Sequence, residues 1–146
     1  TMSHTSEISA VAIVDIGALE ATVSELKASG IRCSLLKNVK PRAYYENQQG
    51  MGVAPFVLKL DDSRYDVGFY ENGKGGYVAR TDLFGGDIQR LLGAAKGEKE
   101  TAEQAAMGKL YQGYAVNAAV RQATKQGYRV QRSVKADGSI QLTMNV

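Results

Sequence analysis

The sequence predicts an α+β fold: a mostly antiparallel sheet with two main helices on one face and a C-terminal β-hairpin. Three observations favour this class. Strand-like alternation with turn residues fills the middle of the chain, helix-patterned stretches lie on either side of it, and alternation returns after Gly127. The 146 residues suffice for a core that buries about two thirds of the unfolded surface. We therefore expect a single domain over residues 2–146.

The N-terminal part predicts a strand, a helix and a second strand. Residues 8–14 have the composition of a strand, and Asp15 follows as a good N-cap. The helix has apolar residues at helical spacing and ends at Gly30; these residues are Ile16, Leu19, Val23 and Leu26. A second strand is expected over residues 31–36. We expect this helix to pack on one face of the sheet.

The middle of the chain predicts a three-stranded meander. Before it, residues 37–53 contain Pro41 and a polar tract, which favour a short strand followed by a mobile loop. The meander strands are expected over residues 56–60, 65–71 and 77–81. Residues 61–64 and 72–76 between them have the composition of hairpin turns.

Two helices are expected after the meander. A short one covers residues 88–95, and a long one covers residues 101–126. The long helix opens with Thr101 and Gln104, which have the spacing of a capping box. Its predicted buried face comprises Met107, Leu110, Tyr111, Tyr114 and Ala118.

A terminal hairpin is expected over residues 128–146, with its turn at Asp137-Gly138. Each strand alternates apolar and polar residues, so each has one apolar side. A two-residue loop would place the two apolar sets on opposite faces, whereas a three-residue loop over residues 136–138, with Gly138 left-handed, places Val134 opposite Ile140. We predict the three-residue loop, with the apolar sides packed beneath the helices.

The net charge of +3 conceals two stretches that contain basic residues and no acid. Within residues 27–42 these are Lys27, Arg32, Lys37, Lys40 and Arg42; within residues 109–135 they are Lys109, Arg121, Lys125, Arg129, Arg132 and Lys135. On one shared surface they would attract phosphates or an acidic protein, and the alternative is scattered solvated side chains. Our candidate contacts to a partner or to nucleic acid are Lys37, Lys40, Arg42, Tyr44, Tyr45, Arg129 and Lys135.

No catalytic, cofactor-binding or metal-ligating set emerges from the sequence. Residues 73–76 are glycine-rich but lie between strands, which indicates a turn and not a phosphate loop. Asp66 falls within a predicted strand, either as a solvent-facing residue, as a hydrogen-bonded anchor, or as a functional contact. His4 is the sole histidine, and Cys33, the sole cysteine, has the pattern of a small buried side chain.

Short motifs along the whole chain resemble a known family. They are Ser3-His4 with Ile8, Tyr65-Asp66-Val67-Gly68-Phe69, Gly76-Tyr77, Asp82, Leu110-Tyr111-Gln112 with Tyr114-Ala115, Gln126-Gly127-Tyr128, and Asp137-Gly138-Ser139-Ile140. In this order they resemble the conserved hypothetical chloroplast reading frame thirty-five family of plastids, cyanobacteria and cyanobacterial viruses. The resemblance implies a source and a fold, and it carries over no catalytic residue.

These observations lead to a ranked expectation of function. The first is a non-enzymatic accessory or protein-interaction domain, because no nucleophile, base and orienting group occur together and hairpin edges are abundant. The second is nucleic-acid binding through residues 27–42 and 109–135, and the third is an enzyme using Asp66 and His4. We expect a monomer or homodimer with an unknown protein partner, no cofactor and no membrane span. The expected location is the cytoplasm, or the host cytoplasm or plastid stroma for a viral or plastid-encoded chain.

Overall fold

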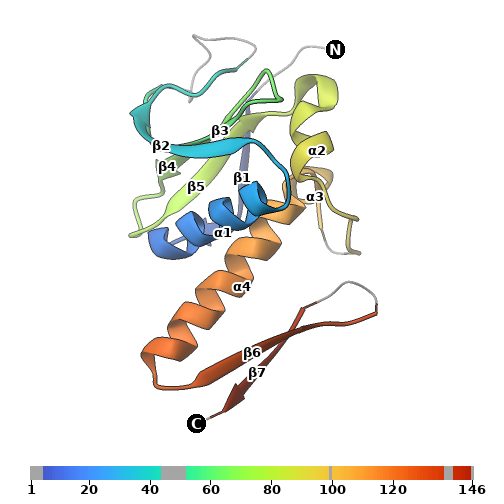
Figure 1. The fold of residues 1–146 in the computed structure, drawn as a ribbon. Coiled ribbons are helices and arrows are strands. Elements are labelled where there is room, and N and C mark those ends of the chain that lie inside the picture. The colour runs from blue at the N-terminus through green and yellow to red at the C-terminus, as the bar shows by residue number, and fades with distance from the viewer. Residues whose placement is uncertain (1–4, 44–51, 99, 137–139, 146) are drawn as a thin grey trace.

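The computed structural model describes residues 5–43, 52–98, 100–136 and 140–145, and within this part the chain folds as α+β (Figure 1). A five-stranded antiparallel sheet has the order β1-β5-β4-β3-β2, and β6 and β7 form a separate two-stranded sheet. Before the hairpin the elements are β1 (Thr5–Ile13), α1 (Ile16–Ala28), β2 (Cys33–Val39), β3 (Ala54–Leu60), β4 (Val67–Glu71), β5 (Tyr77–Asp82), η1 (Phe84–Gly86) and α2 (Asp87–Leu92). They are followed by α3 (Ala102–Ala106), α4 (Gly108–Lys125), β6 (Arg129–Val134) and β7 (Ile140–Asn145).

The predicted meander is confirmed as β3-β4-β5, although β4 begins at Val67 and not at residue 65. Its registers pair Phe56 with Phe69 and Phe69 with Ala79, so apolar side chains from three strands share one face. The turn between β4 and β5 is held by Asn72, whose Oδ1 accepts hydrogen bonds from the backbone N–H groups of Lys74 and Gly76 at 2.8 and 3.1 Å. The glycine-rich segment is therefore a hairpin turn, and no helix begins there.

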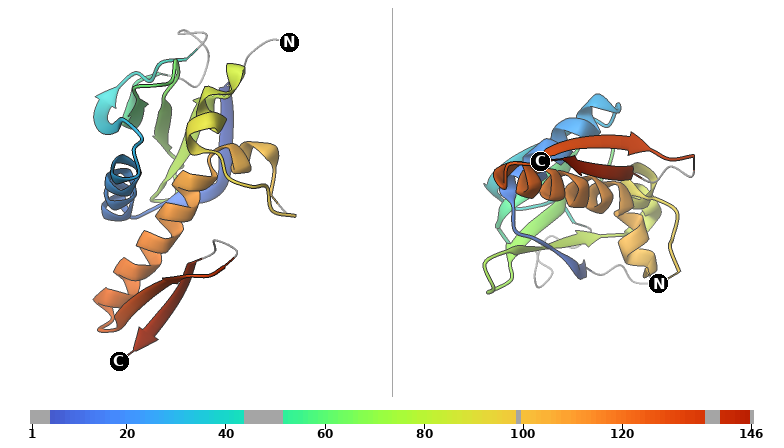
Figure 2. Two further views of the ribbon diagram at one scale, coloured as in Figure 1. Left: turned by 45° about the vertical axis from the view of Figure 1, so that its right-hand side comes forward. Right: turned by 90° about the horizontal axis from the view of Figure 1, so that it is seen from below.

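Helix α1 begins where the sequence predicts. The Asp15 carboxylate accepts a hydrogen bond from the Ala18 N–H at 3.2 Å, which is the N-cap arrangement. Because β1 and β2 are opposite edges of the sheet, α1 crosses one face to connect them (Figure 1). Helix α4 packs against α1 on this same face, so both main helices cover one side of the sheet (Figure 2).

The core lies between these helices and the sheet. Leu19 of α1, Leu58 of β3, Phe69 of β4 and Leu110 of α4 are all fully buried in it. Cys33 also belongs to this core, which confirms the prediction of a buried side chain, and it is 7% exposed. Its burial raises the pKa of the thiol.

The predicted long helix is broken at Met107, which separates α3 from α4. The capping box of Thr101 and Gln104 is present at the start of α3. At the break the Met107 backbone leaves the helical region (φ −114°, ψ 21°), and the nearby Ala105 carbonyl accepts a hydrogen bond from Ala94 N at 2.9 Å. The break at Met107 thus coincides with a hydrogen bond to the segment after α2. The periodicity of apolar residues does not indicate such a break.

Several other predicted boundaries differ from the structure by a few residues. The short helix ends at Leu92, before the predicted end at residue 95, because Gly93 adopts an extended conformation. Strand β2 runs on to Val39 and absorbs the short strand expected after residue 36, while the loop predicted beyond it falls largely on residues 44–51, outside the described residues.

The terminal hairpin has the predicted register but not the predicted burial. Val134 pairs with Ile140, as the three-residue loop requires; the loop residues 137–139 themselves lie outside the described residues. The hairpin is a separate ribbon beside α4, and most of its apolar side chains are exposed (Figure 2). The expectation that these side chains pack beneath the helices is wrong, because the α4 face toward the sheet is already occupied by the core.

None of the helices in the described part of the chain has the length and apolar character needed to cross a bilayer.

Candidate protein-interaction surface

The hairpin and the end of α4 form a distinct lobe, which we call the hairpin lobe and define as residues 117–136 and 140–145. It follows α4 away from the five-stranded sheet (Figures 1 and 2). At its root the Tyr128 N–H donates to the Ala123 carbonyl at 3.1 Å, which folds the chain back beside α4. The lobe is therefore joined to the rest of the structure mainly through α4.

The hairpin exposes a row of large apolar side chains. Val134 is 74% exposed, Met144 57%, Ile140 45% and Tyr128 38%. Alternation along β6 and β7 places Val134, Ile140 and Met144 on one side of the ribbon, together with the half-buried Val130 and Leu142, whose cross-strand partners are Met144 and Arg132. Tyr128 lies just before β6. Exposed apolar side chains that gather on one side of an element are typical of interaction sites.

A polar network fixes this side of the hairpin toward the helices. Arg132 lies on the same side as Val134, and its guanidinium donates to Asn117 Oδ1 of α4 at 2.9 Å and to Glu25 Oε2 of α1 at 3.2 Å. The buried Asn117 amide in turn donates to Thr22 Oγ1 at 3.0 Å and to Glu25. Sequence reasoning missed this role, although the alternation already placed Arg132 among the apolar residues.

A second ion pair ties α4 to the start of α1. Arg121 Nε donates to Asp15 Oδ2 at 2.9 Å. This hydrogen bond is the main reason that the pKa of Asp15 lies below its usual value.

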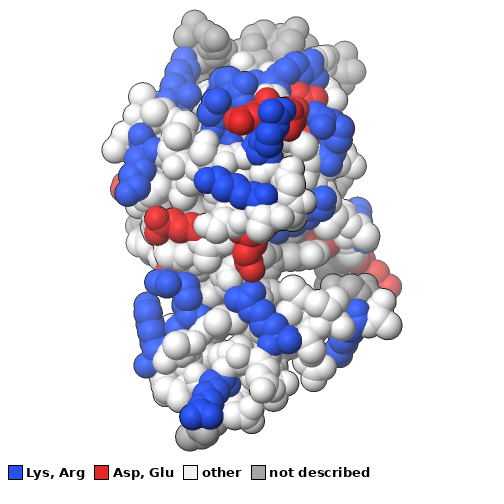
Figure 3. Space-filling view, in the orientation of Figure 1, with Lys and Arg blue, Asp and Glu red and all other residues white. Residues whose placement is uncertain are grey.

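The hairpin lobe is basic. Within its described residues it carries Arg121, Lys125, Arg129, Arg132 and Lys135 and no acid. In Figure 3 the lower part of the visible face, over the hairpin lobe, is mostly blue and white, with an acidic side chain only at its upper border, whereas the upper part interleaves both signs. Arg129 and Lys135 are exposed, and no described carboxylate lies within ion-pair distance of either. The lobe thus combines exposed apolar area with positive charge.

The first basic stretch lies elsewhere. Arg32 pairs with Asp62, and Arg42 pairs with Asp66 at 2.7 Å, so two of its cations are engaged in the body of the fold. Lys37 and Lys40 are exposed at the β2 edge. Helix α1, with the exposed Glu20 and Glu25, lies between β2 and the hairpin (Figure 1). The candidate contacts therefore fall in separate places, and Tyr44 and Tyr45 lie outside the described residues.

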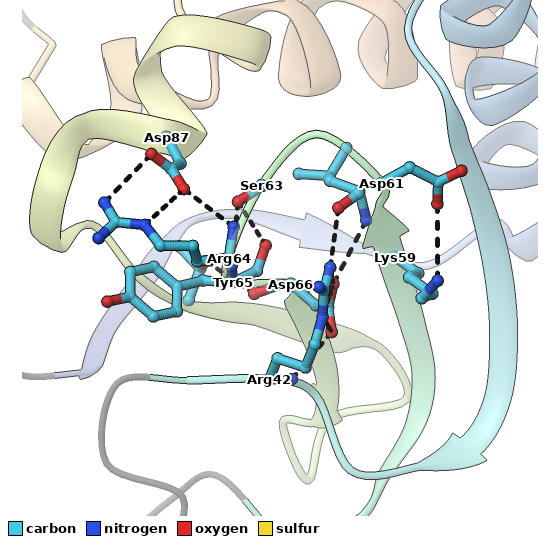
Figure 4. A network of polar contacts seen from close by, with 10 residues as sticks. Arg42, Lys59, Asp61, Ser63, Arg64, Tyr65, Asp66 and Asp87 are labelled. Atoms are coloured by element: carbon cyan, nitrogen blue, oxygen red, sulfur yellow. Dashed lines mark hydrogen bonds and ion pairs between the residues drawn. The ribbon is translucent and has the colours of Figure 1, made fainter.

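Asp66 is a hydrogen-bonded anchor (Figure 4). It is 3% exposed and lies just before β4, not inside the strand as predicted. Its carboxylate accepts from the Arg42 N–H at 2.8 Å, from the Arg42 guanidinium, and from the Leu60 N–H at 3.3 Å. These bonds join the segment after β2 to the β3–β4 turn, so the anchor alternative accounts for its burial.

Metal binding and the enzyme hypothesis both depend on acidic, histidine or cysteine side chains. Among them, no cluster of three His, Cys, Asp or Glu side chains could hold a metal ion. His4, the other residue of the enzyme hypothesis, lies outside the described part of the chain.

Comparison with models of known protein families identifies the family of the chain. The model of the family described as "Protein of unknown function (DUF1257)" matches residues 36–143, which is more than half of the chain. The chain belongs to the DUF1257 family. Its matched range begins in β2 and ends in β7, so the DUF1257 region includes the anchor and all but the last two residues of the hairpin lobe. Searches of curated proteins and of solved structures gave no significant match.

Proposed function

We propose that this DUF1257 protein is a non-enzymatic accessory protein whose hairpin lobe binds an acidic protein partner. The observation that carries the proposal is the exposed apolar row of the hairpin. Leaving a valine, isoleucine or methionine side chain in water forgoes about 1.5–3 kcal/mol of burial free energy per fully exposed residue. A two-stranded hairpin is marginally stable by itself, and a partner that covers this row stabilises it.

The positive charge of the hairpin lobe favours a partner with an acidic surface. Among the described residues of the hairpin lobe there are five cations and no acid, and Arg129 and Lys135 have no ion-pair partner there, so an acidic surface gains both faster association and correct orientation. Binding to such a partner weakens as salt is added, because exposed charge pairs are screened.

Nucleic-acid binding is the second candidate, supported by the same acid-free set of cations. Three features favour a protein partner over it. The two basic stretches are separated by α1, Arg32 and Arg42 are paired with aspartates, and the polar side of the hairpin carries no aromatic residue for base stacking.

The family resemblance suggests the setting in which to search. We propose a cyanobacterial, plastid or cyanobacterial-virus source and a cytoplasmic or stromal location, and therefore a cyanobacterial lysate as the source of partners.

Site-specific photocrosslinking tests the proposal. A photoreactive benzoylphenylalanine in place of Val134 is expected to crosslink an acidic protein in the lysate. The same residue in place of Val53, which is 65% exposed at the start of β3, is the matched control and should not. The captured protein is then purified, and its affinity for the wild-type chain is measured.

Charge reversal decides between the two candidate functions. The double variant Arg129→Glu/Lys135→Glu is expected to weaken binding of the captured protein at least about tenfold, whereas Lys74→Glu in the β4–β5 turn leaves it unchanged. Crosslinks to nucleic acid from position 134, lost in the same double variant, would support the second candidate. Equal crosslinking from positions 134 and 53 would contradict both.

A further inference from the structure

The outer edge of β7 is an unprotected strand edge. In the described residues β7 pairs with β6 alone. Its sequence, Ile-Gln-Leu-Thr-Met-Asn, contains no charge, no proline and no glycine. Exposed edge strands normally carry lysine, proline or a bulge that prevents pairing with another chain, and β7 has none of these features. By contrast β6 carries Arg129 and Arg132.

We infer that β7 is a docking edge that accepts an extended acidic segment of the partner as a third strand of the hairpin sheet. This inference rests on the proposed function and specifies how the partner binds. An added strand pairs with the free backbone N–H and C=O groups of β7 and turns a marginal two-stranded ribbon into a three-stranded sheet.

The two faces of the ribbon specify the side chains of the added strand. On one face its alternate residues lie beside Ile140, Leu142 and Met144, so apolar side chains there extend the exposed row. On the other face they lie beside Gln141, Thr143 and Asn145, which offer amide and hydroxyl donors to carboxylates.

The cations of β6 extend this preference for acid. Arg129 lies opposite Asn145, and Lys135 follows the end of β6. Neighbouring strands are about 4.8 Å apart, so the Arg129 backbone lies about 10 Å from the added strand, within reach of a long arginine side chain facing a glutamate. The segment that fits β7 therefore alternates apolar and acidic residues.

A second copy of the chain is the competing occupant. Two β7 edges could pair around a two-fold axis, but this would bring together two lobes that each carry five cations and no acid in their described residues. Charge complementarity therefore favours the acidic segment.

A peptide probe with selective backbone methylation tests the mode of binding. The probe is an acetylated and amidated octapeptide that alternates valine and glutamate, and its binding to the full chain is measured by fluorescence anisotropy. Two derivatives carry N-methyl groups on all valines or on all glutamates, which removes the N–H donors from one edge or the other while side chains and charge stay the same. Strand addition predicts that one derivative loses affinity at least about tenfold and the other does not, because only one edge faces β7.

Controls separate this mode from general attraction. A peptide with four valines followed by four glutamates has the same composition and should bind at least about tenfold more weakly than the alternating peptide. In heteronuclear NMR spectra, shifts on binding should concentrate in residues 140–145. The Lys74→Glu variant should bind the alternating peptide as the wild type does.

The outcomes also distinguish failure of this inference from failure of the proposed function. Equal loss of affinity in the two methylated peptides, or no binding of any peptide, overturns strand addition, while a charge-sensitive crosslink from position 134 would still support the proposed function. Sedimentation velocity could instead reveal a dimer that does not bind the peptide and that the Thr143→Asp substitution dissociates. This result would assign the β7 edge to a second copy of the chain and would overturn the inference.

Discussion

Arg132 of the hairpin and Asn117 of α4 are joined by a hydrogen bond of 2.9 Å from Nη2 to Oδ1, and this contact helps to orient the ribbon. Arg132 also reaches Glu25 of α1 at 3.2 Å, so one side chain links three elements. Val134 on the same side is mostly exposed, so these polar contacts hold the hairpin beside the helices together with the half-buried Val130 and Leu142.

Replacing Arg132 is expected to loosen the hairpin without unfolding the rest of the chain. Partly exposed ion pairs contribute about 0–1 kcal/mol, so Arg132→Met should change the free energy of global unfolding little. Backbone amides of β6 and β7 should exchange with deuterium about three to ten times faster, as measured by mass spectrometry. Arg129→Met, on the opposite side of the same strand, is the control, and equal exchange in both variants would refute an anchoring role.

Tyr114 is expected to stabilise the junction between β1 and α1. Its buried hydroxyl accepts hydrogen bonds from the backbone N–H groups of Val14 at 2.8 Å and Asp15 at 3.0 Å. Tyr114→Phe leaves both donors without this acceptor and should lower the free energy of unfolding by about 1–3 kcal/mol in urea denaturation. Tyr128→Phe, at a more exposed tyrosine, should change it by less than about 0.5 kcal/mol. Similar values for the two variants would show that the junction does not depend on the hydroxyl.

Removal of the Asp66 carboxylate is expected to destabilise the fold more than removal of an exposed turn aspartate. The Asp66 side chain is 4% exposed and that of its partner Arg42 is 43% exposed, so Asp66→Ala should cost about 2–4 kcal/mol, less than breaking a fully buried pair. Asp61→Ala, whose side chain is 45% exposed, should cost less than about 1 kcal/mol. Urea denaturation of the two variants makes the comparison, and a native-like Asp66→Ala protein would contradict the anchor.

Acid is expected to weaken the contact between the β3–β4 turn and α2. Asp87 accepts hydrogen bonds from the side chain and the backbone N–H of Arg64, and these bonds hold the pKa of its carboxyl below the usual value. An unfolded aspartate has a pKa of about 3.9, so below about pH 5 the unfolded chain binds more protons and the stabilisation from Asp87 is lost as pH falls.

The Asp87→Asn variant tests this pH dependence. It should be less stable than the wild type in urea denaturation at pH 6, and the difference should shrink at pH 3. Arg64→Met, which removes the guanidinium and keeps the carboxylate, should show a smaller version of the same convergence. A constant difference between wild type and Asp87→Asn across this range would contradict the assignment.

Local patterns predicted much of the secondary structure. Period-two alternation with turn residues predicted the meander, and Asp15 marked the start of α1, because strand faces and helix caps are set by residues close in sequence. The break at Met107 was missed because it coincides with a contact between Ala94 and Ala105, and periodicity contains no information on contacts with another segment. The choice among the three roles considered for Asp66 depended on its ion pair with Arg42, which only the structure shows.

For the candidate surface, the sequence by itself determined the pairing of Val134 with Ile140 and the absence of acid in the second basic stretch, because register follows from alternation and charge from composition. Only the tertiary structure decided that most apolar side chains of the hairpin stay exposed, that Arg132 on the same side binds α1 and α4, and that α1 separates the two basic stretches. The burial of a side chain and the charges near it depend on which elements, distant in sequence, pack around it. The apolar residues of α4 already pack in the main core, so they do not cover the hairpin.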